Sequence, residues 1–287
     1  MHIVRTREVR VPTRDAQLDA TLVLPRDPAG VVLFADGSGS SRPGPPDRCV
    51  AGVLNQAGIA TVLLDLLTPE EAQADARTRL LRSDVGLLAR RLVDAVDWLR
   101  GAPDTRGLAI GCFGAGTGAG AALIAAAERT EAVRAVVSRG GRPDLAGEAL
   151  AWVRAPTLLL VGDADTTVMR RNHDALGRMA DAEAVIHVVG GATHLLEEPG
   201  AVEKVAALAR AWFLAKLADR IDPAAAPAGP GADRATGPAD CCDPIADPCR
   251  VAPERGVTGG EWGRGGEVDA SGVNPAFAGT APSDGVA

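Results

Sequence analysis

Hydrophobic residues follow two different patterns between the N-terminus and about Arg220. Short uninterrupted apolar runs alternate with longer segments in which apolar residues recur every three or four positions. The first pattern is typical of strands buried on both faces of a sheet, and the second of helices that bury one face. Because parallel strands need a crossover between them, the alternation predicts a doubly wound, mostly parallel sheet with helices on both sides.

The same patterns predict the individual elements. An antiparallel pair of strands at the sheet edge is expected at 9–12 and 18–24, before about six buried strands. The buried runs are 30–35, 58–65, 107–113, 133–137, 156–161 and 184–189, and the expected helices are 47–56, 83–99, 117–128, 145–153, 168–179 and 200–219. The charged stretch 66–82 is either a short surface helix or a cap over a pocket, and both alternatives stay open.

Composition changes sharply after this alternating region. From Pro223 onward Pro, Gly, Ala and Asp dominate, and no apolar period remains. A segment so poor in large apolar residues cannot offset its own ordering entropy. We therefore expect one α/β domain over residues 1–220 and a disordered tail over residues 221–287.

Charge and cysteine content exclude several classes of function. The net charge of −7 argues against nucleic acid and anionic membranes as partners. The N-terminus has no apolar signal core, and no run reaches the roughly 18 apolar residues of a membrane span, so a cytoplasmic protein is expected. Cys241, Cys242 and Cys249 have no matching histidine cluster, so neither a metal site nor another cofactor is expected. The oligomeric state is not predicted.

The stretch 110–123 combines an apolar run, a cluster of glycines and an alanine-rich run. This is the layout of a nucleophile elbow, in which Gly-x-Ser-x-Gly holds a serine on a strained turn between a strand and a helix. Here the motif reads Gly114-Ala-Gly-Thr-Gly118, and its central position is Gly116. Glycine adopts the unusual backbone conformation of the elbow without strain. The pattern therefore predicts the frame of an active site without its attacking atom.

The residues that follow the other strands complete this frame. In such sheets the ligand crevice lies beyond the carboxyl ends of the strands. Asp165 follows one late strand, in Gly162-Asp-Ala-Asp165, and His194 follows the next, in Gly190-Gly-Ala-Thr-His194. The resulting order of nucleophile position, acid and histidine is the order that α/β-hydrolases use.

With these motifs the chain resembles the dienelactone hydrolase-like group of α/β-hydrolases over nearly all of residues 20–218. The loop Asp36-Gly-Ser-Gly-Ser-Ser41 and the segment Ser138-Arg-Gly-Gly-Arg-Pro-Asp-Leu145 carry the resemblance further. It implies cleavage of a small ester or lactone, with Asp165 as the acid and His194 as the base of a triad. It also implies an oxyanion hole made by the backbone N–H groups of Thr117 and of the Gly37-Ser38 turn.

Two positions depart from the family pattern. Gly116 stands where the family has serine or cysteine, so no acyl-enzyme can form there. Loss of one triad member leaves roughly 10³- to 10⁴-fold catalysis over water. Asp36 stands where such loops often have histidine, and a carboxylate about 5 Å from a developing oxyanion would oppose it by roughly 3 kcal/mol. We therefore expect an activity that is weak or lost.

The sequence contains other groups that could attack in place of a side chain at position 116. A water molecule above Gly116 is a sensible attacking group if His194 activates it while Asp165 holds the histidine tautomer. Cys112 is expected inside the strand, and Thr117 is expected to present its backbone rather than its hydroxyl. Ser38, Ser40 and Ser41 are typical turn residues.

Arg139 and Arg142 follow a strand end and are candidates for binding an anionic group of a substrate, with Asp36 as a third residue that lines the site. An ion pair with Asp144 or Asp65 is an equally plausible role for either arginine. The alternative function is accordingly a non-catalytic module that binds a carboxylate-bearing small molecule or a partner. A phosphate-binding loop is disfavoured, since no Gly-Lys-Ser/Thr follows the glycines at 114–120. The sequence does not identify a natural substrate.

Overall fold

The computed structural model describes residues 4–37, 44–198 and 200–218. The predicted tail with its three cysteines, and the hydroxyls of Ser38, Ser40 and Ser41, lie outside the described residues. Within the described ranges, no helix is long and apolar enough to cross a membrane. The same ranges contain no group of three His, Cys, Asp or Glu side chains that could hold a metal ion.

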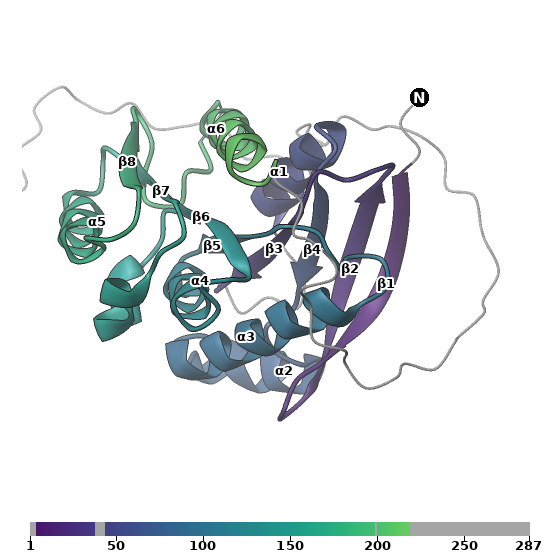
Figure 1. Cartoon of the computed structure of the whole chain (residues 1–287). Coiled ribbons are helices and arrows are strands. Elements are labelled where there is room, and N and C mark those ends of the chain that lie inside the picture. Colours follow the sequence, from purple (N-terminus) through teal and green to yellow (C-terminus); the bar gives the residue numbers. More distant parts are fainter. Residues whose placement is uncertain (1–3, 38–43, 199, 219–287) are drawn as a thin grey trace, which may run out of the picture. The chain divides into compact units, whose positions relative to one another are not determined.

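An eight-stranded sheet organises the domain, in the order β1-β2-β4-β3-β5-β6-β7-β8 (Figure 1). The strands are β1 (Val4–Pro12), β2 (Gln17–Pro25), β3 (Val31–Asp36), β4 (Ala60–Leu64), β5 (Ile110–Ala115), β6 (Val133–Arg139), β7 (Thr157–Gly162) and β8 (Ala184–Val189). The β1–β2 and β2–β4 pairs are antiparallel, and every later pair is parallel. The prediction of an edge pair followed by six strands in a mostly parallel sheet is confirmed. The last of these six was expected to be buried, but β8 forms the other edge of the sheet, and its Val185 and Val188 are exposed.

Helices cover both faces of this sheet. One face carries α1 (Pro45–Gln56) and α6 (Ala201–Lys216) (Figure 1). The other carries α3 (Val85–Gly101), α4 (Thr117–Glu128) and α5 (Thr166–Arg178). The doubly wound arrangement is therefore confirmed, and α4 has the bounds that the sequence predicted.

One predicted helix has a different form. The segment η1 (Pro143–Trp152) is 3₁₀-helical and is interrupted at Gly147, whose φ is 54°. A residue in this conformation breaks the hydrogen-bond ladder that an α-helix needs. The prediction of an ordinary helix at 145–153 is therefore wrong in type.

The charged stretch 66–82 forms a short surface helix, α2 (Pro69–Thr78), which is the first of the two alternatives. Thr68 and Glu71 form a capping box at its start, with each side chain bonded to the other's backbone N–H. The buried Arg91 of α3 donates a hydrogen bond from Nη1 to Oε2 of Glu71 at 2.6 Å, which attaches the start of α2 to α3. The segment after α2 then runs toward the elbow, where the Arg82 carbonyl accepts a hydrogen bond from the Thr117 hydroxyl.

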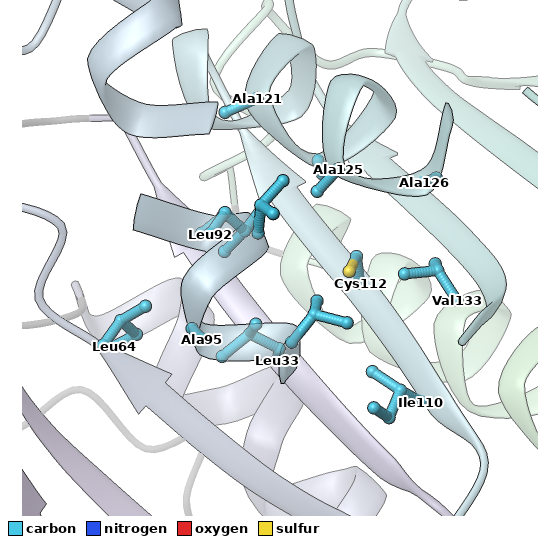
Figure 2. Close-up of a cluster of buried hydrophobic side chains, with 14 of the residues drawn as sticks. Leu33, Leu64, Leu92, Ala95, Ile110, Cys112, Ala121, Ala125, Ala126 and Val133 are labelled. Atoms are coloured by element: carbon cyan, nitrogen blue, oxygen red, sulfur yellow. The ribbon is translucent and has the colours of Figure 1, made fainter. Parts of the chain in front are cut away.

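Two apolar layers hold the helices onto the sheet. Figure 2 shows the layer beneath α3 and α4, in which Cys112 lies among leucines, valines and alanines. The opposite layer contains Phe34 and Phe113, whose ring centroids lie 4.8 Å apart. The alanine-rich composition of α4 suits this packing, because small side chains let a helix lie close to the strands.

Candidate active site

Gly116 forms the turn between β5 and α4, and its backbone angles are φ 54° and ψ −126°. Side chains of L-residues rarely adopt this conformation, which is the kind of strained turn that a nucleophile elbow requires. Its carbonyl accepts a hydrogen bond from the Arg142 N–H at 2.9 Å, which holds the turn in place. A Cβ at position 116 would have no heavy atom within 4 Å. A side chain at this position would therefore point into open space.

The neighbouring glycines play a different role. A Cβ on Gly118 would overlap the Ala35 carbonyl, and a Cβ on Gly114 would lie only 2.5 Å from the Cα of Ala119. These contacts are too short for any side chain. Glycine is therefore required by packing at 114 and 118, whereas at 116 there is room for a larger residue.

Asp165 and His194 lie together, as the order of strand ends predicted. Asp165 caps the start of α5: its Oδ1 accepts hydrogen bonds from the Thr167 and Val168 amides at 3.0 and 2.9 Å. Its Oδ2 lies 3.6 Å from Nδ1 of His194, whose side chain is half exposed. That distance exceeds a normal hydrogen bond, but catalytic contacts often tighten only when substrate binds. The helix cap therefore orients the acid toward the histidine.

Glycines at two strand ends let the histidine loop, residues 190–198, approach the sheet. A Cβ on Gly140 would overlap the His194 carbonyl, and one on Gly162 would overlap the carbonyls of Ala192 and Thr193. The Ala192 carbonyl also accepts a hydrogen bond from Ala164 at 3.2 Å. Asp163 shapes the same loop, because its Oδ1 accepts the Gly191 amide at 2.8 Å. The loop is thus docked through its backbone.

The predicted oxyanion hole needs one correction. The Gly37 amide donates to the Ala115 carbonyl at 3.2 Å, so this N–H is already used between β3 and β5. Ser38, the other member of the turn, lies outside the described residues. Thr117 is the first residue of α4, where a backbone N–H has no acceptor within the helix. Of the three predicted residues, Thr117 is therefore the described candidate for a donor.

Neither alternative nucleophile is placed to attack. The Thr117 hydroxyl lies 2.8 Å from the Arg82 carbonyl, to which it donates a hydrogen bond. Cys112 is fully buried, and burial raises the pKa of its thiol to about 12, so it does not form a thiolate near neutral pH.

The two arginines are both committed to ion pairs. Arg142 binds Asp144 through two hydrogen bonds of 2.8 and 2.7 Å, and this pairing lowers the pKa of Asp144. Arg139 is buried and contacts Asp47 of α1 at 3.1 Å. The expected ion pair is found for Arg142, but the partner of Arg139 is neither Asp144 nor Asp65. No sequence pattern distinguished Asp47 from an ordinary acid in the first turn of a helix.

Further acidic side chains lie near Asp47, the partner of Arg139. Burial raises the pKa of Asp47 to about 6; the Arg139 charge opposes this shift, while the charges of Asp36 and Glu197 add to it. Asp36, the last residue of β3, is thus close enough to interact electrostatically with Asp47. The predicted lining residues Asp36 and Arg139 therefore belong to one charged cluster beside the histidine loop.

Comparison with known proteins agrees with this geometry. Residues 18–216 match the model of the dienelactone hydrolase family. The crystal structure of a dienelactone hydrolase from Anabaena variabilis is 55% identical and superposes with a TM-score of 0.72. The match covers 75% of this chain and 99% of that one.

More distant structures share the fold alone. A dienelactone hydrolase-like promiscuous phosphotriesterase from metagenomic libraries is 17% identical, with a TM-score of 0.61 over 75% of this chain and 98% of that one.

Two Mycobacterium tuberculosis proteins, provisionally named phosphoribosyl transferases, are 51% identical over 214 residues. That match covers 75% of this chain but 47% of theirs, so the chain spans about half the length of these curated relatives.

Proposed function

Because the chain belongs to the dienelactone hydrolase family, we propose that it is an ester- or lactone-hydrolase type of protein whose activity is weak or lost. One observation carries this proposal. Gly116 has the backbone conformation of a nucleophile elbow and open space where a side chain would lie, but it has no side-chain oxygen or sulfur that could attack a substrate.

The chemistry follows from what each group does. In a complete site a hydroxyl or thiol at position 116 attacks the ester carbonyl, and the histidine takes its proton. His194 and Asp165 are close enough to serve as base and orienting acid. Without the nucleophile these two residues have only water to activate. Water attack is slower, because the attacking atom is no longer held covalently beside the carbonyl carbon.

The alternative, a module that binds a carboxylate ligand, has less support. Arg139 and Arg142 were its expected anchors, and each already has an aspartate partner. A ligand carboxylate would have to share a guanidinium that an aspartate already binds, which weakens the attraction for a second anion. The name of the mycobacterial relatives does not extend to this chain either, because those proteins are about twice as long as the part that matches.

The test is Gly116→Ser in the full chain, with 4-nitrophenyl acetate and a small lactone as substrates. We expect wild type to hydrolyse both poorly, and the serine variant to raise kcat/KM by about 100-fold or more. Gly116→Ala is the matched control, since it adds the same Cβ without the hydroxyl. Wild-type turnover at the rate of an ordinary serine esterase, with no gain from serine, would contradict the proposal.

A further inference from the structure

Residues 138–142 connect the elbow with the histidine loop. The Arg142 amide donates to the Gly116 carbonyl at 2.9 Å, on the elbow side. On the other side, Arg139 Nη1 donates to the Leu195 carbonyl at 2.6 Å, and Gly140 makes room for the His194 carbonyl. Two successive carbonyls of the loop therefore contact two successive residues at the end of β6: the Leu195 carbonyl is hydrogen-bonded to Arg139, and the His194 carbonyl lies against Gly140.

The arginine in this arrangement is itself rigidly held. Its side chain is 7% exposed, and that of its partner Asp47 is 1% exposed. A buried charge persists only where a partner compensates it, so Asp47 keeps the guanidinium in place. The planar group then offers one nitrogen to Asp47 and another to Leu195. Lysine carries the charge but cannot present two donors in this fixed geometry.

The histidine loop needs such an anchor. Leu196, next to the held carbonyl, has a φ of 53°, although it is not glycine. A strained conformation of this kind persists only when surrounding contacts impose it. Leu196 is also fully buried, and its amide donates to the Thr193 carbonyl at 3.3 Å. The bond from Arg139 to the Leu195 carbonyl attaches the end of β6 to the turn that carries His194.

We infer that Arg139, held by Asp47, is a positioning residue that fixes His194 relative to the elbow, rather than a residue that binds substrate. The inference rests on the proposed function only for the role of His194 as the base. The surrounding charges agree with it: besides Asp47 on α1, which pairs with Arg139, the carboxylates of Asp36 on β3 and Glu197 in the loop are close enough to raise the pKa of Asp47. They disfavour the approach of an anionic ligand to the guanidinium.

The first test measures the loop itself, by amide hydrogen exchange of the full-length protein with peptides that cover 190–198. We expect Arg139→Met to speed exchange there by about tenfold or more, because local opening no longer breaks the bond to Leu195. Arg139→Lys should recover part of the protection. The control is Arg129→Met, which removes a more exposed arginine–aspartate pair with Asp97 at the far end of α4 and should leave the loop peptides unchanged.

Removing Arg139 alone leaves Asp47 buried without a partner, so that variant can fail to fold. The double variant Asp47→Asn/Arg139→Met removes both charges and keeps the test decisive. Fast loop exchange in a folded double variant supports the inference. Unchanged loop exchange overturns it, and so does protection of the loop by acetate or benzoate that depends on Arg139, because that result would make Arg139 a ligand-binding residue.

The second test measures whether the placement of His194 by Arg139 affects catalysis, and it uses the Gly116→Ser variant as the starting protein. Loss of Arg139 should lower kcat about tenfold or more with KM within about twofold, since alignment of the base is lost and ground-state binding is not. A raised KM with unchanged kcat overturns the inference. If Gly116→Ser has no activity, the proposed function fails, and the exchange experiment still decides the role of Arg139.

Discussion

The elbow and the histidine loop differ in what each brings to the candidate site. The elbow has the backbone turn, with Gly116 at a positive φ that glycine adopts without strain, but no side-chain nucleophile. The histidine loop has both an imidazole ring, which lies beside Asp165, and backbone supports at the ends of β6 and β7. The close packing of Gly114 and Gly118 and the bond from Arg142 support the elbow turn, and none of these contacts involves a side chain at position 116.

The largest expected effect tests whether the histidine loop is still competent. In the Gly116→Ser background, His194→Ala should remove most of the gained activity, roughly 10²- to 10³-fold in kcat, because the serine loses its base. The measurement is steady-state hydrolysis of 4-nitrophenyl acetate. His173→Ala is the control, since this histidine is exposed on α5. If the gain persisted without His194, the two regions would not form one site.

The next largest effect concerns protein stability and compares alanine substitutions at two glycines of the elbow. Gly118→Ala should lower the free energy of unfolding by about 3 kcal/mol or more, because its Cβ overlaps the Ala35 carbonyl. Gly116→Ala should cost less, about 1 to 3 kcal/mol, since its Cβ is in open space and the cost is the backbone conformation alone. Urea unfolding monitored by tryptophan fluorescence compares the two. Equal costs would mean that position 116 is as constrained as position 118.

The smallest effect concerns the ion pair beneath the histidine loop, and it depends on pH. The pKa of Asp47 is raised to about 6 in the folded protein, above its ordinary value of 3.8. The folded state therefore favours the protonated carboxyl of Asp47. Its contribution to the free energy of unfolding is fully present below the unfolded pKa and is lost as pH rises through about 6. The stability of wild type relative to Asp47→Asn should fall by roughly 2 to 3 kcal/mol between pH 4 and 7.

Urea unfolding of both proteins across this range measures the difference. Carboxylates whose pKa is lowered by an arginine, such as Asp97 and Asp144, act in the opposite direction and mainly below pH 4. Since both proteins contain them, their effect cancels in the comparison. A difference that does not change with pH would show that Asp47 ionises normally, as an exposed acid does.

Local signals predicted the parts of the fold that depend on neighbours in sequence. The change from an apolar run through glycines to alanines located β5, Gly116 and the bounds of α4, because each feature involves residues a few positions apart. The form of η1 was missed, since the effect of Gly147 depends on a backbone conformation that composition does not reveal. Gly37 was assigned as an oxyanion donor, but its amide bonds to the end of β5, a partner far away in sequence.

The sequence by itself determined the order of the site residues along the chain and the missing atom at Gly116, because both are properties of covalent structure. Only the tertiary structure decided what Arg139 does. Its partner Asp47 lies 92 positions earlier, on a helix brought to the end of β6 by the winding of the sheet. A buried guanidinium binds whichever carboxylate and carbonyl the fold places around it. Spacing along the chain carries no information about that choice.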